Sequence, residues 1–434
     1  MATTGTSRTW FDDARFGMFI HWDHASQRGL EVSWPLVGGM FTLPFCQNVT
    51  PDEYHALAAT FCPDAWDPVD LAARARAAGM RYVVFTTRHH NGFSMFDTRC
   101  SDHNIMKSAY GRDLVRELVD AFRTEGLHIG FYYSLSDWYH PDYPPFLEEH
   151  KPYFPGMTPP RSAPEQADRF RAYLLGQLTE LLTNYGAIDV LWFDGQWERS
   201  PDWWDTKAIA KLARDLQPGI LINDRLPGEG DFVTPEQFVP ATAPGERWES
   251  CYTMNDSWGW NPDDTEYKSP RAIVHALCET VGRGGNLLLN ISPRGDGSLP
   301  PEQLERLEAV AQWMARHHDA IHETDAGLEP WQFYGPSTRQ GATVNLFLLA
   351  RPYESITVRG LPVRRVQNVR ILGTGTPLAF STRTGVLEQI AHDPDGEVII
   401  EIPESALDEY ATVVTFDLAD AVIEGRRPVA RVAP

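Results

Sequence analysis

The 434-residue sequence has no run of about 18 apolar residues, which a membrane-spanning helix would require. It is also poor in basic residues, with 38 Lys and Arg against 59 Asp and Glu and a formal net charge of −21. Nucleic acids and anionic membrane surfaces select basic proteins, so we expect neither as a partner. A neutral or cationic ligand fits this charge better.

Cysteine is scarce and scattered. The five cysteines form no C-x-x-C pair, which fits a reducing cytoplasm better than a disulfide framework. The first residues lack a basic region followed by an apolar one, so the sequence predicts no signal peptide and a cytoplasmic location. A leader removed beforehand would leave the same pattern. The oligomeric state is left open, a homo-oligomer included.

Two groups of cofactor motifs are missing as well. No G-x-G-x-x-G follows the first predicted strand, so a dinucleotide-binding fold is not indicated. There is no H-x-H or H-E-x-x-H, and no cysteine lies near His21, His89 or His90, so a metal site is not favoured. We expect no metal and no cofactor.

What is present is an alternation of apolar strands and amphipathic helices over about the first 320 residues. Strands that are apolar throughout and separated by helices indicate a parallel sheet buried on both faces. Six or more such units favour a closed TIM-like (β/α) barrel, predicted over residues 1–320, with an open doubly wound sheet as the alternative. The helix at 301–318 would close the barrel. The predicted strands are 17–23, 81–90, 128–138, 187–195, 219–224 and 286–292.

The last hundred residues have a different character. From about residue 330, short β-rich runs such as VNLFLLA, SITVRGL and ATVVTFDL are separated by Gly, Pro and Asp turns. This pattern predicts a C-terminal all-β sandwich over residues 333–434. The predicted fold class is therefore α/β, a (β/α) barrel followed by a β-sandwich.

The predicted barrel strands end in polar and aromatic residues, and the carboxyl ends of barrel strands are where active sites lie. Such a set can bond several hydroxyls, while tryptophan faces stack on a pyranose ring, so we expect a carbohydrate as the partner. The strand-end residues are His21, Trp22, Asp23, His89, His90, Asn91, Tyr132, Tyr133, Asp137, Trp138, Trp192, Asp194, Trp197, Asn223, Asp224, Arg225 and Asn290.

Hydrolysis of a glycosidic bond requires two carboxyl groups, about 5 Å apart if the anomeric configuration is retained. Asp194, at the end of the apolar run VLWFD, is the candidate for the ionised one. We expect Glu249, in the tryptophan-flanked segment ERWESC, to be the second, because desolvation would raise its pKa. Glu198 is the competing choice, and Glu246 and Asp256 are weaker ones.

Several longer segments, in this order over about residues 10–318, are WFDDARFGMFIHW, AAGMRYVVFTTRHHNGFSMFDT, GRDLVRELVDAFRTEGLHIGFYYSLSDW, DVLWFDG, RWESC followed by SWGW, and VGRGGNLLLNISPRGDG. Together they resemble the α-L-fucosidases of glycoside hydrolase family 29. The resemblance implies a retaining exo-glycosidase without a cofactor, with Asp194 as nucleophile and Glu249 as acid/base. The resemblance also implies sugar-binding roles for His21, Trp34, His89, His90, Tyr133, Arg225 and Trp258. The strand-end residue Trp192 completes the predicted substrate-binding set.

Three positions depart from the family pattern. The usual H-W-G is HWD at Asp23, the usual H-H-D-G is HHNG at Asn91, and the usual E-W reads Ser33-Trp34. In the family that glutamate ordinarily meets a sugar hydroxyl, so we expect its loss to shift the sugar specificity unless Glu31 reaches in instead. The prediction is thus a retaining α-L-fucosidase, with an α-L-galactosidase or α-L-glucosidase, or a carbohydrate-binding protein on a dead barrel, as alternatives.

Overall fold

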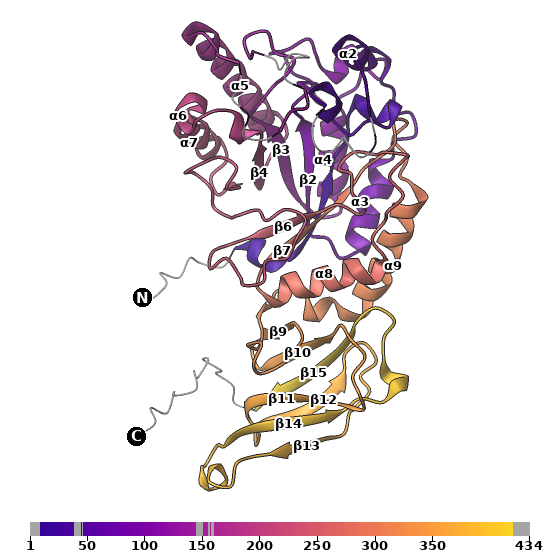
Figure 1. Ribbon diagram of the computed structural model, residues 1–434, viewed down its shortest axis with the longest axis vertical. Helices are drawn as coiled ribbons and strands as arrows, with labels where there is room; N and C mark the ends of the chain where they lie inside the picture. Colours follow the sequence, from indigo (N-terminus) through magenta and orange to yellow (C-terminus); the bar gives the residue numbers. More distant parts are fainter. Residues whose placement is uncertain are drawn as a thin grey trace. The chain divides into compact units, whose positions relative to one another are not determined.

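The computed structural model describes residues 9–38, 45, 47–144, 151–154, 157 and 160–419. Its described part contains a seven-stranded parallel sheet in the order β5-β4-β3-β2-β1-β7-β6 (Figure 1). The strands β1, β2, β4 and β7 are buried along their whole length, as expected when helices cover a curled sheet. The strands are β1 (Phe16–Ile20), β2 (Tyr82–Arg88), β3 (His128–Ser134), β4 (Val190–Asp194), β5 (Leu221–Ile222), β6 (Glu249–Tyr252) and β7 (Asn286–Ile291).

The edge strands β5 and β6 are joined through residues 232–236. Isolated parallel bridges pair Asn223 with Phe232, Val233 with Trp248, and Glu236 with Cys251. Backbone bonds from Glu249 N to Val233 O and from Cys251 N to Pro235 O support the same path. This segment takes the place of a further barrel strand.

The six predicted strands correspond to β1–β5 and β7, whereas β6 was not predicted. The predicted helix at 301–318 is α9, and the apolar face of α5, from Phe170 to Leu182, is buried. The helices are α1 (Trp10–Ala14), α2 (Pro51–Thr60), α3 (Pro68–Ala77), α4 (Leu114–Thr124), α5 (Pro164–Asn184), α6 (Pro201–Trp204), α7 (Thr206–Leu216), α8 (Pro270–Gly282) and α9 (Pro301–His317).

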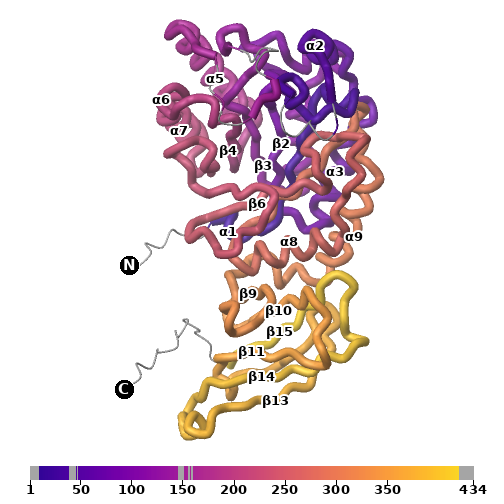
Figure 2. Tube along the Cα trace, in the orientation of Figure 1, coloured from indigo at the N-terminus to yellow at the C-terminus, as the bar shows by residue number. Residues whose placement is uncertain are grey.

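The C-terminal strands form two antiparallel sheets, drawn from orange to yellow in Figure 2. Their orders are β12-β15-β10-β9-β8 and β11-β14-β13. Buried side chains from both sheets, such as Phe416 and Ile400, form one apolar core, so the predicted sandwich is confirmed. The strands are β8 (Asp325–Ala326), β9 (Ser337–Gln340), β10 (Thr343–Leu348), β11 (Ser355–Pro362), β12 (Val366–Ile371), β13 (Phe380–Arg383), β14 (Asp395–Glu401) and β15 (Thr412–Leu418).

The chain divides into two compact units. One contains residues 14–269 and 286–312, and with them all seven strands of the parallel sheet. The other contains residues 9–13, residues 270–285 with α8, and the β-sandwich strands. The sequence boundaries at 1–320 and 333–434 stay a prediction.

Gly17 in β1 permits the tight packing of Tyr82 from β2. A Cβ at Gly17 would lie 2.4 Å from Tyr82 Cζ, and Tyr82 is fully buried. We expect Gly17→Ala to lower the free energy of unfolding by about 1–3 kcal/mol, because a rigid ring must shift in a packed interior. Urea unfolding followed by tryptophan fluorescence measures this. In the control Gly385→Ala, the nearest atom would be Glu388 Cγ at 3.5 Å, and equal midpoints for both variants would contradict the expectation.

Candidate active site

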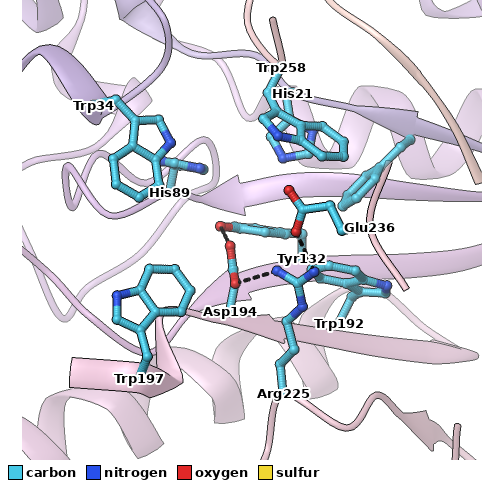
Figure 3. Close-up of a pocket in the computed structure, with 11 residues that line it drawn as sticks. His21, Trp34, His89, Tyr132, Trp192, Asp194, Trp197, Arg225, Glu236 and Trp258 are labelled. Carbon is cyan, nitrogen blue, oxygen red and sulfur yellow. Dashed lines mark hydrogen bonds and ion pairs between the residues drawn. The ribbon is translucent and has the colours of Figure 1, made fainter. Parts of the chain in front are cut away.

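A cavity opens at the carboxyl ends of the barrel strands. Figure 3 shows two carboxylates, an arginine and aromatic rings facing one another across it. The lining residues are Phe19, His21, Trp34, His89, Tyr132, Trp192, Asp194, Trp197, Arg225, Glu236 and Trp258.

Asp194 is the last residue of β4, so a rigid strand holds its carboxylate at the cavity. Tyr132 Oη donates to Oδ2 at 2.8 Å, and Arg225 Nη1 donates to Oδ1 at 2.8 Å. Burial alone would raise the pKa of Asp194, but the charge and bonds of Arg225 and the Tyr132 hydroxyl hold it below its ordinary value. The carboxylate is therefore ionised at neutral pH.

Glu236 is the second carboxylate at the cavity, and it lies on the segment that joins β5 to β6. Arg225 Nη2 donates to Glu236 Oε2 at 2.7 Å, so a single guanidinium bonds both acids. The side chain of Glu236 is 31% exposed, against 11% for Asp194. Sequence reasoning missed Glu236 because Pro235 interrupts the run; the apolar pair Phe232-Val233 just before it was the available signal.

Glu249 does not lie at the cavity, and this corrects the expected placement. It is the first residue of β6, where its backbone pairs with the first residue of β7, while Asp194 ends its own strand. Its carboxyl group is completely buried and accepts bonds from Trp192 Nε1 at 3.0 Å and from Tyr82 Oη. Burial raises its pKa to about 7. Glu249 thus lies inside the barrel beneath Trp192.

The other acids named from the sequence are not among the lining residues either. Glu198 is buried and accepts bonds from three aromatic side chains. Glu246 and Asp256 are exposed at the surface.

The histidines take different positions. His21 and His89 line the cavity. The amide of Asn290 donates to the Trp258 carbonyl, so its oxygen accepts from His21 Nδ1 at 2.7 Å and Nε2 is left as an acceptor. Burial lowers the pKa of His21 to about 3, which keeps the ring neutral. His90 lies behind the lining residues, with Nε2 3.8 Å from Asp194 Oδ2.

Tyr132 rather than Tyr133 faces the cavity, which corrects the second expected placement. The register pairs Ser134 with Asp194 and Tyr132 with Trp192, and alternate residues of a strand share a face. Tyr133 points the other way, toward α5, where its hydroxyl donates to Gln177 Oε1 at 2.9 Å. Ser134 pairs with Asp194, so Tyr132, two residues earlier, lies on the same face as Ser134, and Tyr133 lies on the opposite face.

Tryptophans form much of the cavity wall. Trp34, Trp192 and Trp258 lie there as expected, and Trp197 joins them. The Arg225 guanidinium lies 4.6 Å from the Trp192 ring centroid, a cation–π contact.

The three departures from the family pattern are bonded to one another beside His89. Asn91 Nδ2 donates to Asp23 Oδ2 at 2.7 Å, and the Asn91 backbone N donates to Ser33 Oγ at 2.8 Å. Ser33 Oγ lies 2.5 Å from His89 Nδ1. Glu31 does not reach the cavity; it accepts bonds from the backbone N–H groups of Trp258 and Gly259. Ser33 therefore stands where the family glutamate is expected.

Two carboxylates, an arginine and tryptophan walls at the carboxyl ends of a (β/α) barrel define a glycoside hydrolase. The family model described as Alpha-L-fucosidase matches residues 3–319. The chain belongs to the α-L-fucosidase family. Within the described residues, no three or more His, Cys, Asp or Glu side chains are arranged to hold a metal ion, and no helix is long and apolar enough to cross a membrane.

Relatives match over nearly the whole chain. The tissue α-L-fucosidase of Bos taurus is 31% identical over 404 residues, covering 86% of this chain and 81% of the relative. The structure of α-L-fucosidase isoenzyme 1 from Paenibacillus thiaminolyticus is 35% identical with a TM-score of 0.80, covering 95% and 98%. An α-L-fucosidase from Bacteroides thetaiotaomicron, described as a trapped covalent intermediate, is 26% identical with a TM-score of 0.80, covering 96% and 98%.

The buried carboxyl of Glu249 predicts a pH-dependent stability. Its pKa is 4.5 when unperturbed and about 7 in the folded protein, so between these values the folded state binds the proton more strongly than the unfolded state. Its contribution to stability therefore falls as pH rises through this window. Relative to wild type, Glu249→Gln should gain up to roughly 3 kcal/mol in free energy of unfolding from about pH 5 to about pH 8. Urea titrations at each pH measure this, and a constant difference would contradict the raised pKa.

Proposed function

We propose that this protein hydrolyses α-L-fucosides with retention of configuration, with Asp194 as nucleophile and Glu236 as acid/base. The observation that carries the proposal is that Arg225 bonds one carboxylate through each of its terminal nitrogens, at 2.8 Å and 2.7 Å. This arrangement fits the separation of about 5 Å between the carboxyl groups of retaining glycosidases. Glu249 is too deep to meet a substrate and is not proposed for this role.

In the first step, Asp194 forms a bond to the anomeric carbon while the bond from that carbon to the leaving oxygen breaks and Glu236 gives its proton to this oxygen. In the second step, Glu236 takes a proton from water, the water oxygen bonds the anomeric carbon, and the ester bond to Asp194 breaks. The low pKa of Asp194 keeps the nucleophile ionised. Arg225 and Tyr132 fix the direction of its oxygens.

Two of the similar structures support this scheme. The Bacteroides protein is described as a covalent intermediate trapped with 2-fluoro-fucosyl fluoride. A Thermotoga maritima protein, 28% identical with a TM-score of 0.73, is described as an α-L-fucosynthase in complex with α-L-Fuc-(1-2)-β-L-Fuc-N3. A covalent glycosyl intermediate is what a retaining mechanism requires.

We expect the sugar preference to depend on the side chains bonded around His89. Ser33 is bonded there in place of the family glutamate, which is the observation that keeps α-L-galactosides and α-L-glucosides as second candidates. The alternative of a binding protein without turnover is disfavoured, because two carboxylates lie at the cavity.

Asp194→Gly should lower kcat/KM on an aryl α-L-fucoside by about 10³-fold or more, because no covalent intermediate can form. Added azide should restore turnover and give the β-L-fucosyl azide, since azide enters from the side of the missing carboxylate. Proton NMR identifies this product.

The wild-type reaction tests retention. Proton NMR of this reaction should show the α-anomer of L-fucose first. A first-formed β-anomer would refute retention. Aryl α-L-galactoside and α-L-glucoside, run in parallel, decide the sugar.

Glu236→Ala should lower kcat/KM by about 10²–10⁴-fold on a substrate with a poor leaving group, and less on an activated one. Azide should rescue the activated substrate and give the α-azide, because it replaces the water that Glu236 activates. Glu249→Gln is the matched control and should stay within about tenfold of wild type, since only positioning is affected. If Glu249→Gln loses activity as Glu236→Ala is expected to, the acid/base is Glu249.

A further inference from the structure

Glu198 is a buried carboxylate for which the proposed reaction has no use. It ends the short 3-10 helix η6 (Gln196–Glu198) that follows the nucleophile strand, and it is 3% exposed. Trp138 Nε1 and Tyr153 Oη donate to its Oε1 at 3.0 and 3.1 Å, and Tyr143 Oη donates to Oε2. Burying a carboxylate is costly, and three convergent donors offset that cost.

One of these donors connects Glu198 to the cavity wall. Trp197 Nε1 donates to Tyr153 Oη at 2.7 Å, and the same hydroxyl donates to Glu198. The Tyr153 hydroxyl thus accepts one bond and donates the other. This two-bond chain fixes the indole of Trp197, which lines the cavity.

The same donors surround the second wall residue, Trp34. Its ring is almost parallel to that of Trp197, with 7° between the planes and 6.4 Å between the centroids. Tyr153 and Trp138 also pack against it, with centroids at 6.3 and 5.8 Å. Figure 3 shows Trp34 and Trp197 together on one side of Asp194. We call these two residues the tryptophan wall.

The wall is assembled from separate parts of the chain. Trp34 begins η2 (Trp34–Leu36), Trp138 and Tyr153 follow β3, and Trp197 with Glu198 follows β4. Hydrogen bonds are more directional than ring packing and therefore add to it in fixing the orientation of an indole. Glu198 is where the segment after β3 is bonded to the segment after β4, and Trp34 packs on Trp138 and Tyr153 of the former segment.

We infer that Glu198 is a positioning residue that holds the tryptophan wall in the orientation in which it stacks on a pyranose ring. The nature of the ligand rests on the function proposed above. Removing the carboxylate leaves buried donors unpaired and lets the indoles turn. Because the wall contacts the bound sugar and not the breaking bond, its loss weakens ground-state and transition-state binding equally, so KM rises while kcat is kept.

Four single variants and one double variant test this inference. Glu198→Ala and Tyr153→Phe should each raise KM on an aryl α-L-fucoside, and the Kd of L-fucose by calorimetry, about tenfold, with kcat within about threefold. The double variant should be no worse than the poorer single one, since both break the same chain. Glu198→Gln should stay near wild type, because its amide oxygen still accepts from Trp138 and Tyr153.

Tyr143→Phe is the matched control. Tyr143 donates to the other oxygen of Glu198, and its ring packs with Phe170 and Trp204, away from the wall. This variant should lower the free energy of unfolding while leaving KM within about twofold, since a lost buried bond costs stability alone. A KM that rises equally in Tyr143→Phe and Tyr153→Phe would overturn the positioning role in favour of a general loss of folding.

Other outcomes separate this inference from the function proposed above. Glu198→Gln with a lost kcat, or azide rescue of Glu198→Ala, would make Glu198 a catalytic residue instead. If wild type binds L-fucose but hydrolyses no α-L-fucoside, the proposed function fails while the Kd series still tests the wall. If wild type binds no L-fucose, near-UV circular dichroism of the tryptophans decides, and an unchanged spectrum in Tyr153→Phe would refute the inference.

Discussion

The site depends on the bonds that the Arg225 guanidinium makes to Asp194 and Glu236. Two carboxylates near each other on a mostly buried surface repel, and each alone would be expensive to desolvate. Arg225 bonds one through each terminal nitrogen and rests on the face of Trp192. It thereby fixes the separation of the acids and the ionisation of Asp194 at once. The position of Trp192 then matters as much as that of Arg225.

Trp192 connects the cavity to the interior of the barrel. Its indole N–H donates to Glu249, and its ring stacks on Tyr132, which donates to Asp194. Burying the Glu249 carboxyl, whose pKa is about 7, is unfavourable. Its bond to Trp192 fixes the ring on which Arg225 lies, and this offsets the unfavourable burial. Glu198 has a comparable place beside the cavity, so this barrel uses acids to orient tryptophans on two sides.

Part of the site could be predicted from the sequence because the carboxyl ends of parallel strands meet at one end of the barrel. A continuous apolar run that ends in a polar residue indicates both a buried strand and a residue at that end. This pattern correctly brought together four cavity-lining residues, Asp194, His21, His89 and Arg225. Depth within the barrel could not be predicted, because Glu249 looks the same in sequence at either end of a four-residue strand. Glu236 could not be predicted because Pro235 interrupts its segment, and Tyr132 could not be distinguished from Tyr133 because the register of β3 against β4 is not readable from the sequence. The cytoplasmic location and the oligomeric state stay predictions.

The two proposed catalytic acids differ in the number of side chains that bond them and in their exposure, in keeping with their proposed tasks. Asp194 must bring an oxygen to bonding distance of one carbon, so a central strand and bonds from two neighbouring side chains fix it. Glu236 exchanges a proton with an oxygen whose position varies with the leaving group, and an irregular, part-exposed segment suffices for that. Arg225 bonds both acids, so in this site the second carboxylate is identified by its bond to Arg225 and not by a sequence motif around Glu236.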